Sequence, residues 1–334
     1  MEMNHETRLT SAEMASLWLQ YVKDTAKLCV LKYFSAKVED RDFRTVIEFG
    51  VRSTEEYLTS LTDLFERENF PIPTGFSNKD VNTNAPRLFS DLYFIYNLKD
   101  MTVAQMSADA LAIGLGSRYD IVAFHEKLLN DAVQLQVMIK EVLLKKGVYV
   151  RPPYISLPDQ AEFVTNQNFL GNLMGKQRPL TVIEISHLFL TNETNFVAKE
   201  TLLGFAQVAK SEKVKNYFIR GKEIANKQMK ILKQVLTQDD LPAPMLWDSA
   251  VTNSKVSPFS DKLMMFLITA MAAGGIAKYG AAMGSSPRKD VALKYGRLLV
   301  EISLYAEDGA NIMIEKGWFE EPPHSPDHNR LIRE

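Results

Sequence analysis

The chain has 334 residues, 46% hydrophobic and 24% charged, which is ordinary for a globular protein with room for two or three domains. Lys and Arg total 39 against 41 Asp and Glu, and no basic stripe or acidic tail stands out, which argues against nucleic acid or an anionic membrane as partner. Cys29 is the single cysteine, so an intrachain disulfide is excluded; in its apolar run, Leu28-Cys29-Val30-Leu31, it is expected to be a buried core residue.

The N-terminal end carries a helix start signal but no secretory signal. Residues 1–8 lack the apolar stretch of a signal peptide, so we expect a protein that is cytoplasmic in the cell that makes it. In Leu9-Thr10-Ser11-Ala12-Glu13-Met14, the Thr10 hydroxyl can accept the third helical N–H while Glu13 accepts the N–H of Thr10. This capping box and the apolar spacing after it predict a helix over residues 9–36.

Three more helices are predicted before residue 150. The second follows a turn at Glu39-Asp40 and must end before Phe70-Pro71-Ile72-Pro73, because proline lacks an N–H and restricts the residue before it. The third runs from about residue 87 to Gly114-Leu115-Gly116, and the fourth covers residues 118–146, with Gly147 at its C-terminal cap.

The same signals return in the second part of the chain. Leu180-Thr181-Val182-Ile183-Glu184-Ile185 repeats the opening capping box, and Lys146-Gly147 returns as Lys316-Gly317. The pair Pro71 and Pro73 likewise returns as Pro242 and Pro244. Shared helical composition would align apolar stripes but not prolines and glycines, so the chain is read as an internal duplication.

Strand patterns are nearly absent, so the predicted fold class is all-α, with two tandem four-helix bundles. The predicted organisation is an N-terminal tail (1–8), a first bundle (9–153), a connector (154–179), a second bundle (180–323) and a C-terminal tail (324–334).

One apolar helix in the second copy needs a separate interpretation. Residues 263–277 are uncharged, but they are fewer than the roughly 20 that a membrane span requires, so we expect a buried bundle helix and no transmembrane segment. Its small residues, such as Gly274, Gly275 and Gly280, would let another helix approach closely, and we expect a contact between the bundles or between chains there.

Several longer motifs resemble a known family. They are Phe70-Pro71-Ile72-Pro73, Ala85-Pro86-Arg87-Leu88-Phe89-Ser90-Asp91, Arg151-Pro152-Pro153, Pro258-Phe259-Ser260-Asp261-Lys262-Leu263-Met264-Met265-Phe266 and Asp308-Gly309-Ala310-Asn311-Ile312-Met313-Ile314. With them the chain resembles, over residues 9–323, the tandem ferritin-like family of spore-forming bacilli catalogued as a domain of unknown function of the DUF3231 type. Some of its members carry the label "putative spore coat protein". The resemblance implies a ferritin-like bundle for each copy and no particular activity.

Ferritin-like bundles often hold two metal ions with Glu side chains and Glu-x-x-His pairs. Glu184-Ile185-Ser186-His187 fits the pattern but lies in the first turn of a helix, where the capping box already accounts for Glu184. A second match, Glu2 with His5, lies in the tail. Neither position predicts a metal ligand in a bundle interior.

Glu200 and Glu223 form the better-placed pair, because they lie about equally far from the turn between the first two helices of the second copy. Asn226 stands where the histidine would be, and the matching first-copy residues are Cys29 and Arg52. In the resemblance, relatives often carry histidines at the positions of Gln228 and Leu267, which are absent here. Solvated or paired glutamates are the simpler interpretation, with an iron or manganese site as the alternative.

The remaining candidates are polar residues in or near the predicted fourth helices. His125, matched by Tyr295 in the second copy, is expected to be a polar bundle residue, since no Ser or Cys nucleophile pairs with it. Two Arg-x-Asp pairs repeat at the start of that helix, and they are expected to stabilise the helix start and the preceding turn. These pairs are Arg118 with Asp120 and Arg288 with Asp290.

The preferred hypothesis is a non-enzymatic structural or interaction protein of a spore-forming bacterium, incorporated in the spore, with no cofactor. Its expected partners are proteins or a second copy in a homo-oligomer, and not nucleic acid. The alternatives are a metal-dependent ferritin-like oxidase or metal store using Glu200 and Glu223, and a carrier of a small molecule held between helices.

Overall fold

The first half of the chain consists of four long helices. The computed structural model describes residues 7–172, 177–244, 250–328 and 332. The helices of the first half are α1 (Ser11–Lys37), α2 (Arg41–Arg67), α3 (Asp91–Leu115) and α4 (Tyr119–Lys145), with a short 3-10 helix η1 (Asn78–Asp80) between α2 and α3. The third helix, predicted from about residue 87, begins later than expected, because Ser90 caps α3 and the preceding residues contact the other half. It includes Gly114 and Leu115 and ends at Gly116.

The second half repeats this order and confirms the duplication. Its helices are α5 (Val182–Val208), α6 (Glu212–Gln238), α7 (Asp261–Ser285) and α8 (Lys289–Glu315), preceded in the connector by the 3-10 helix η2 (Gln167–Leu170). Both predicted capping boxes are present, at Thr10 with Glu13 and at Thr181 with Glu184. The described residues form no strand, so the all-α prediction is confirmed.

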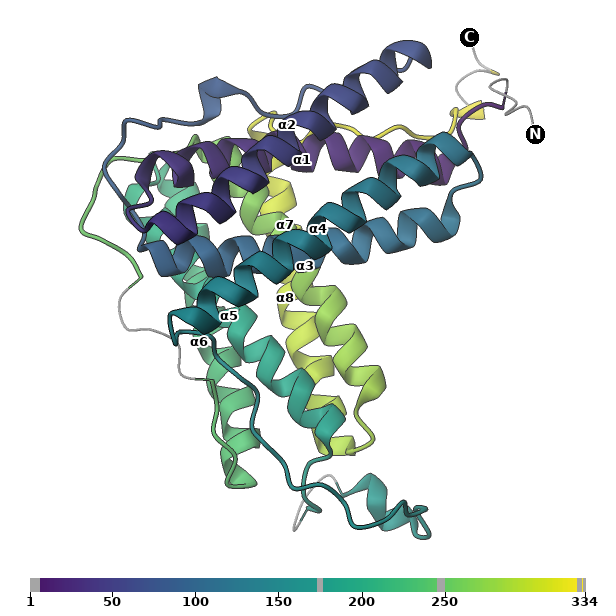
Figure 1. Ribbon diagram of the computed structural model, residues 1–334, viewed down its shortest axis with the longest axis vertical. Coiled ribbons are helices and arrows are strands. Elements are labelled where there is room, and N and C mark those ends of the chain that lie inside the picture. Colours follow the sequence, from purple (N-terminus) through teal and green to yellow (C-terminus); the bar gives the residue numbers. More distant parts are fainter. Residues whose placement is uncertain (1–6, 173–176, 245–249, 329–331, 333–334) are drawn as a thin grey trace.

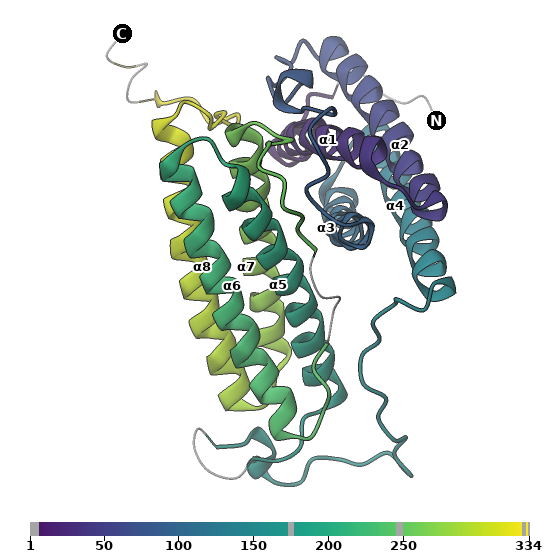
Figure 2. The same cartoon turned by 90° about the vertical axis from the view of Figure 1, so that its left-hand side faces the viewer.

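The two halves are set across each other. In Figure 1, α1 and α3 run across the picture while α5 to α8 run along its long axis. Figure 2 shows α5 to α8 side by side and α3 almost end on. Within the second half, α5 pairs with α6 and α7 with α8, and the first half repeats this pairing in α1 with α2 and α3 with α4.

The loops before α3 and α7 exchange hydrogen bonds reciprocally. Val81 bridges to Phe259, and at the matching positions Val251 bridges to Phe89. Backbone bonds follow the same symmetry, since Ser260 N donates to Asp80 O at 2.9 Å and Ser90 N donates to Ala250 O at 2.8 Å. Each half therefore completes the other, in the way that two subunits meet across a twofold axis.

A single apolar core spans the junction of the halves. The Phe89 ring packs against Gly204 of α5 so closely that a Cβ at Gly204 would lie 2.4 Å from it. Across the same junction, the Tyr93 hydroxyl is 2.7 Å from the Thr201 hydroxyl, and the partly buried Lys99 ammonium donates to Glu193 at 2.7 Å. The halves are thus joined by apolar packing and by polar contacts, although the second oxygen of Glu193 is buried without a hydrogen-bond partner.

Helix α7 is long and apolar enough to cross a membrane by length and composition, and it is the one such helix in the described part of the chain. It packs against α5 and α8. Of its small residues, Gly275 approaches α8 of the same half, where a Cβ would lie 2.9 Å from Ile302. The contact between halves is instead made by the loops and by α3 with α5.

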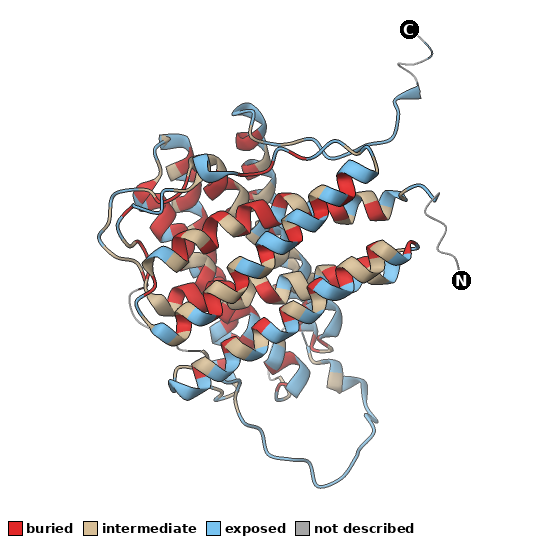
Figure 3. Ribbon diagram, turned by 45° about the horizontal axis from the view of Figure 1, so that its top comes forward, coloured by how far each residue is buried: buried red, intermediate tan, exposed pale blue. Residues whose placement is uncertain are grey.

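The connector crosses open surface before it meets the second half. Most residues from 151 to 168 are exposed, in contrast with the helix faces that turn toward one another (Figure 3). The connector is fixed again at η2, where the Arg178 guanidinium lies over the Phe169 ring at 4.2 Å and donates to its carbonyl.

Candidate functional site

A group of buried polar side chains lies inside the first half. We call it the first polar centre, and its members come from three helices: the buried Gln20, Asp24, Lys27, Asp109 and His125 and the half-buried Gln105. His125 Nδ1 is 2.9 Å from Asp109 Oδ1, and Gln105 donates to the other oxygen of Asp109 at 3.1 Å. Lys27 Nζ donates to Gln105 at 3.3 Å, which joins α1 to α3. The prediction of His125 as a polar bundle residue is confirmed.

Burial controls the charges in this centre. It raises the pKa of Asp24 to about 6, against the opposing influence of Lys27 and a hydrogen bond from Gln20. Burial also lowers the pKa of Lys27, while the charges of Asp24 and Asp109 act in the opposite direction. One oxygen of Asp24 is buried without a hydrogen-bond partner. The Lys27 ammonium is therefore the internal positive charge that faces these carboxylates.

The second half has a polar centre at matching positions, built from uncharged residues. Asn195, Tyr279 and Tyr295 replace Asp24, Asp109 and His125. The Tyr279 hydroxyl is 2.6 Å from Gln228 Oε1 and 3.0 Å from Asn195 Oδ1, and the Tyr295 hydroxyl is 3.0 Å from Thr191. Ala198 stands at the position of Lys27, so the polar centre of the second half lacks the carboxylates and the ammonium that the first polar centre contains.

The first polar centre has almost no free volume. A cavity beside Lys27, Tyr57 and Asp131 measures about 10 Å³, the minimum for one water molecule. Both ring nitrogens of His125 already have partners, Asp109 and Ser16. The centre can hold helices in register, but it has no room for a substrate beside its titratable groups.

The two glutamates proposed as weak metal candidates have different surroundings. Glu200 is buried on α5, pairs with Lys199 at 2.9 Å and acts through its charge on Tyr93 of α3. Glu223 is exposed on α6, as are Asn226 and, in the first half, Arg52. Across residues 7–172, 177–244 and 250–328, no group of three or more His, Cys, Asp or Glu side chains is placed to hold a metal ion.

The other sequence candidates have structural roles or lie outside the described residues. Cys29 is buried, donates to the Ser77 carbonyl at 3.4 Å, and has its pKa raised to about 11 by burial. Both carboxylate oxygens of Glu184 are engaged by Thr181, Arg178 and Arg288, so the Glu-x-x-His pattern with His187 does not form a site. The pattern Glu2 with His5 lies outside the described residues.

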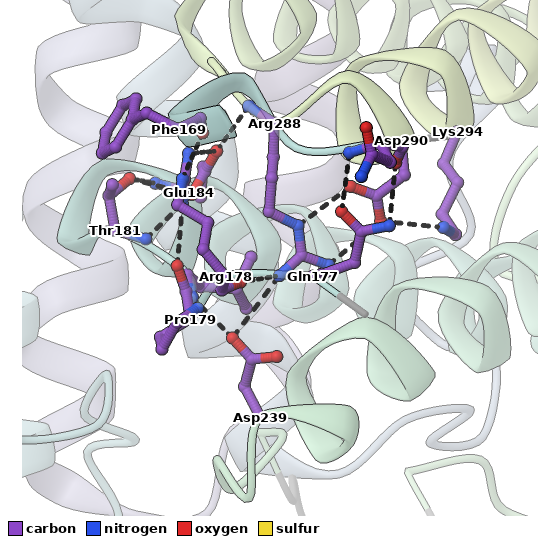
Figure 4. Close-up of polar contacts among 12 residues, drawn as sticks. Phe169, Gln177, Arg178, Pro179, Thr181, Glu184, Asp239, Arg288, Asp290 and Lys294 are labelled. Carbon is purple, nitrogen blue, oxygen red and sulfur yellow. Dashed lines mark hydrogen bonds and ion pairs between the residues drawn. The ribbon is translucent and has the colours of Figure 1, made fainter. Parts of the chain in front are cut away.

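The second capping box belongs to a larger ionic cluster (Figure 4). Glu184 accepts from the backbone N–H of Thr181 at 2.8 Å and of Arg288 at 2.9 Å, and it pairs with Arg178 at 2.9 Å. Burial by itself would raise the pKa of Glu184, but hydrogen bonds from Arg178, Thr181 and Arg288 lower it below its ordinary value. The capping residue thus ties the start of α5 to the start of α8.

Arg288 completes this cluster from a buried position. Its guanidinium donates to both oxygens of Asp290, at 2.9 and 3.0 Å, and to the Arg178 carbonyl at 2.9 Å. In the first half, Arg118 binds Asp120 and Glu68 in the same way, and Glu13 accepts from the Arg118 N–H. The predicted structural role of the Arg-x-Asp pairs is confirmed.

The most exposed of the large apolar side chains lie in the connector. Tyr154, Leu157 and Phe163 are 88%, 90% and 96% exposed within an extended segment. Folded proteins rarely leave such a cluster of large apolar side chains in water unless it contacts a partner. The sequence predicts a connector here, with Phe169-Leu170 as an apolar piece that packs against a bundle, but it does not single out these three residues, because exposure depends on how the halves pack.

Comparison with known proteins gives one family match and one similar solved structure. The family model described as "Protein of unknown function (DUF3231)" matches residues 1–160 and again residues 168–331. A crystal structure from Bacillus halodurans C-125, described as a "putative spore coat protein", is similar over 45% of this chain and 98% of its own, with 20% identity and a TM-score of 0.43. The comparison with curated proteins finds no match.

Proposed function

Since the chain belongs to the DUF3231 family of proteins of unknown function, we propose that it is a non-enzymatic structural or interaction protein of a spore-forming bacterium. In this proposal it is made in the cytoplasm, binds other proteins and is incorporated in the spore. The label "putative spore coat protein" that some family members carry supports the spore assignment.

The exposed connector is the observation that supports an interaction role. Tyr154, Leu157 and Phe163 lie within one short segment that leaves its side chains in solvent. An extended backbone of this kind can align with a partner while its apolar side chains enter pockets on that partner. Covering three large apolar side chains would supply several kcal/mol, at roughly 25 cal/mol per Å² of buried apolar surface.

The interiors support a role without chemistry on a substrate. In the first polar centre the titratable groups are closed in, and Lys27 provides the positive charge that faces Asp24 and Asp109. In the second, uncharged residues hydrogen-bond to one another. Both centres resemble internal braces between helices, since buried polar groups with fixed partners favour one packing arrangement over others.

We expect protein purified without chelators to contain no stoichiometric iron or manganese, because the His125 ring nitrogens and the Asp109 oxygens already have partners within the chain. Elemental analysis by mass spectrometry measures this directly, in wild type and in Glu223→Ala. Metal present at one or more ions per chain, and lost in Glu223→Ala, would overturn the proposal in favour of the metal-dependent alternative.

Spore incorporation is expected to depend on the connector. In a spore-forming bacillus, a fluorescent fusion of the wild-type chain should be enriched in purified spores, and Leu157→Ser with Phe163→Ser should reduce that signal by at least about fivefold. The reason is loss of apolar contact area at positions that pack on nothing within the fold.

The matched control is Leu111→Ser with Tyr119→Ser, which removes two exposed apolar side chains of the first half. This control should leave the spore signal and the thermal unfolding midpoint unchanged. The proposal would be wrong if the wild-type fusion stays in the mother cell. It would also be wrong if the connector variants reach the spore as well as wild type does.

A further inference from the structure

One face of α8 is exposed along its length and has the spacing of a coiled-coil seam. Seven exposed residues, separated alternately by four and three positions, form this α8 seam: Leu293, Arg297, Val300, Leu304, Glu307, Asn311 and Ile314. A coiled coil places its contact residues at the same alternating intervals, so that they stay on one side of the helix. The opposite side of α8, including Tyr295 and Leu298, faces the core of the half.

The apolar members of the α8 seam are solvent-exposed. Leu293, Val300, Leu304 and Ile314 are 54%, 57%, 59% and 62% exposed. Beside them, Arg220 and Ile224 of α6 form the other wall of a groove of about 710 Å³. The second half therefore offers a groove along residues 293–308 of α8, in which Leu293, Val300 and Leu304 alternate with charged side chains.

The first half lacks the apolar centre of this seam, although Val137 and Leu144 are exposed at the positions that match Glu307 and Ile314. The residues of α4 that match Val300 and Leu304, the centre of the seam, are Asn130 and Gln134. The matched position for Arg297 is Lys127, which pairs with Glu56 on its own surface at 3.0 Å. The two copies have the same fold, so the fold does not require an apolar face at these positions.

The charges of the seam indicate what covers it. Arg297 lies toward the N-terminal end of α8, where its charge also acts on Glu301 one turn along the helix, and Glu307 lies toward the C-terminal end. A second α8 in parallel register would place Arg297 against Arg297 and Glu307 against Glu307, which is repulsive. In antiparallel orientation, with a twofold axis level with residue 302, each Arg297 meets Glu307 of the other copy.

The same register satisfies the apolar positions. Counting from residue 302, Val300 of one copy lies level with Leu304 of the other, and this contact occurs twice about the axis. Leu293 lies level with Asn311, so the seam is apolar at its centre, ionic on both sides of it and mixed at its ends. A surface that is complementary to itself under a twofold rotation is the form that homodimer interfaces take.

We propose that the α8 seam is a homodimer interface, in which α8 of a second copy packs antiparallel along it, between Leu293 and Asn311. The occupant is therefore a second copy of this chain, oriented by two Arg297–Glu307 ion pairs. This interface is separate from the exposed connector, so a test of the dimer does not depend on whether the proposed spore function is correct.

Sedimentation equilibrium of the full chain tests the proposal. At about 100 μM, wild type should show the mass of a dimer, and Val300→Glu should raise the dimer dissociation constant by about 100-fold, because it places two carboxylates at the apolar centre. The matched control is Val133→Glu on α4, an exposed valine outside the seam, which should dimerise as wild type does. Circular dichroism checks that each variant is folded.

Charge reversal tests the orientation. Arg297→Glu and Glu307→Arg should each weaken the dimer by about tenfold, and the double variant should restore it, because the ion pairs then form with their partners exchanged. A wild-type chain that remains monomeric, a dimer that tolerates Val300→Glu, or a double variant weaker than both single variants would overturn the proposed interface.

Discussion

Replacing Lys27 by methionine is expected to lower the free energy of unfolding by about 3–5 kcal/mol at pH 7. The side chain is buried and donates to Gln105, and its charge acts on both Asp24 and Asp109. Without it, the buried carboxylate of Asp24 keeps only the exposed Lys23 as a nearby cation. Chemical denaturation of wild type and Lys27→Met at several pH values measures the loss.

The sign of the pH dependence follows from Asp24. Its folded pKa is raised from 3.8 to about 6, so the native state holds more protons, and stability falls as pH rises from about 4 to about 6. In Lys27→Met the Asp24 carboxylate no longer has the Lys27 charge that offsets its burial. The variant should therefore lose most stability above pH 6, where this carboxyl is ionised. Below about pH 4, where the carboxyl is protonated in both states, the difference from wild type should shrink.

The second half supplies the compensating change. It carries Asn195 and Ala198 where the first half has Asp24 and Lys27. Asp24→Asn combined with Lys27→Met should therefore recover most of the loss, since a neutral buried pair has no charge to desolvate. Two results would contradict this account of the first polar centre. The loss of unfolding free energy in Lys27→Met could be the same at pH 4 as at pH 7, or adding Asp24→Asn could fail to reduce it.

Arg288→Met is expected to have the second large effect, and to lower the free energy of unfolding by about 3–5 kcal/mol. Arg288 is one of the largest fully buried side chains, and it donates to both oxygens of Asp290 and to the Arg178 carbonyl. Methionine fills part of the space but leaves Asp290 with Lys294 as its remaining cation. The start of α8 would then lose its tie to the start of α5.

The duplication provides a graded comparison for that experiment. Arg118→Met should cost less, about 1–2 kcal/mol, because its partners Asp120 and Glu68 are more exposed to solvent than Asp290 is. Arg52→Met, at an exposed position, should stay within about 0.5 kcal/mol of wild type. Equal losses in all three variants would show that burial of the ion pair does not set its importance.

Local chemistry explains why much of the fold was predictable. Helix starts follow from side chains within one turn, such as Thr10 with Glu13, and helix ends follow from Pro71 or Gly147. These are short-range effects, so they can be read from neighbouring residues. The return of the same signals after Leu180 established the duplication, because turn residues repeat only when the whole architecture repeats.

The polar centres could be predicted only in part. His125 was identified as a polar bundle residue, but its partner Asp109 and the nearby Asp24 and Lys27 were not, since they come from other helices. The sequence does contain a pattern that indicates polar centres. Polar residues occupy matching positions of the two copies on otherwise apolar helix faces, as at Asp24 and Asn195. Which of them meet depends on how the helices rotate and pack.

The sequence by itself determined the helices, their ends, the duplication and the family, because those follow from local capping, proline and glycine chemistry and from long shared motifs. Only the tertiary structure decided which surfaces remain uncovered. It buried Glu200 and exposed Glu223, joined the halves through reciprocal loops around Phe89 and Phe259, and left the α8 seam in solvent. Exposure is a property of the packed chain, since the same apolar residue is core or contact surface according to what lies against it.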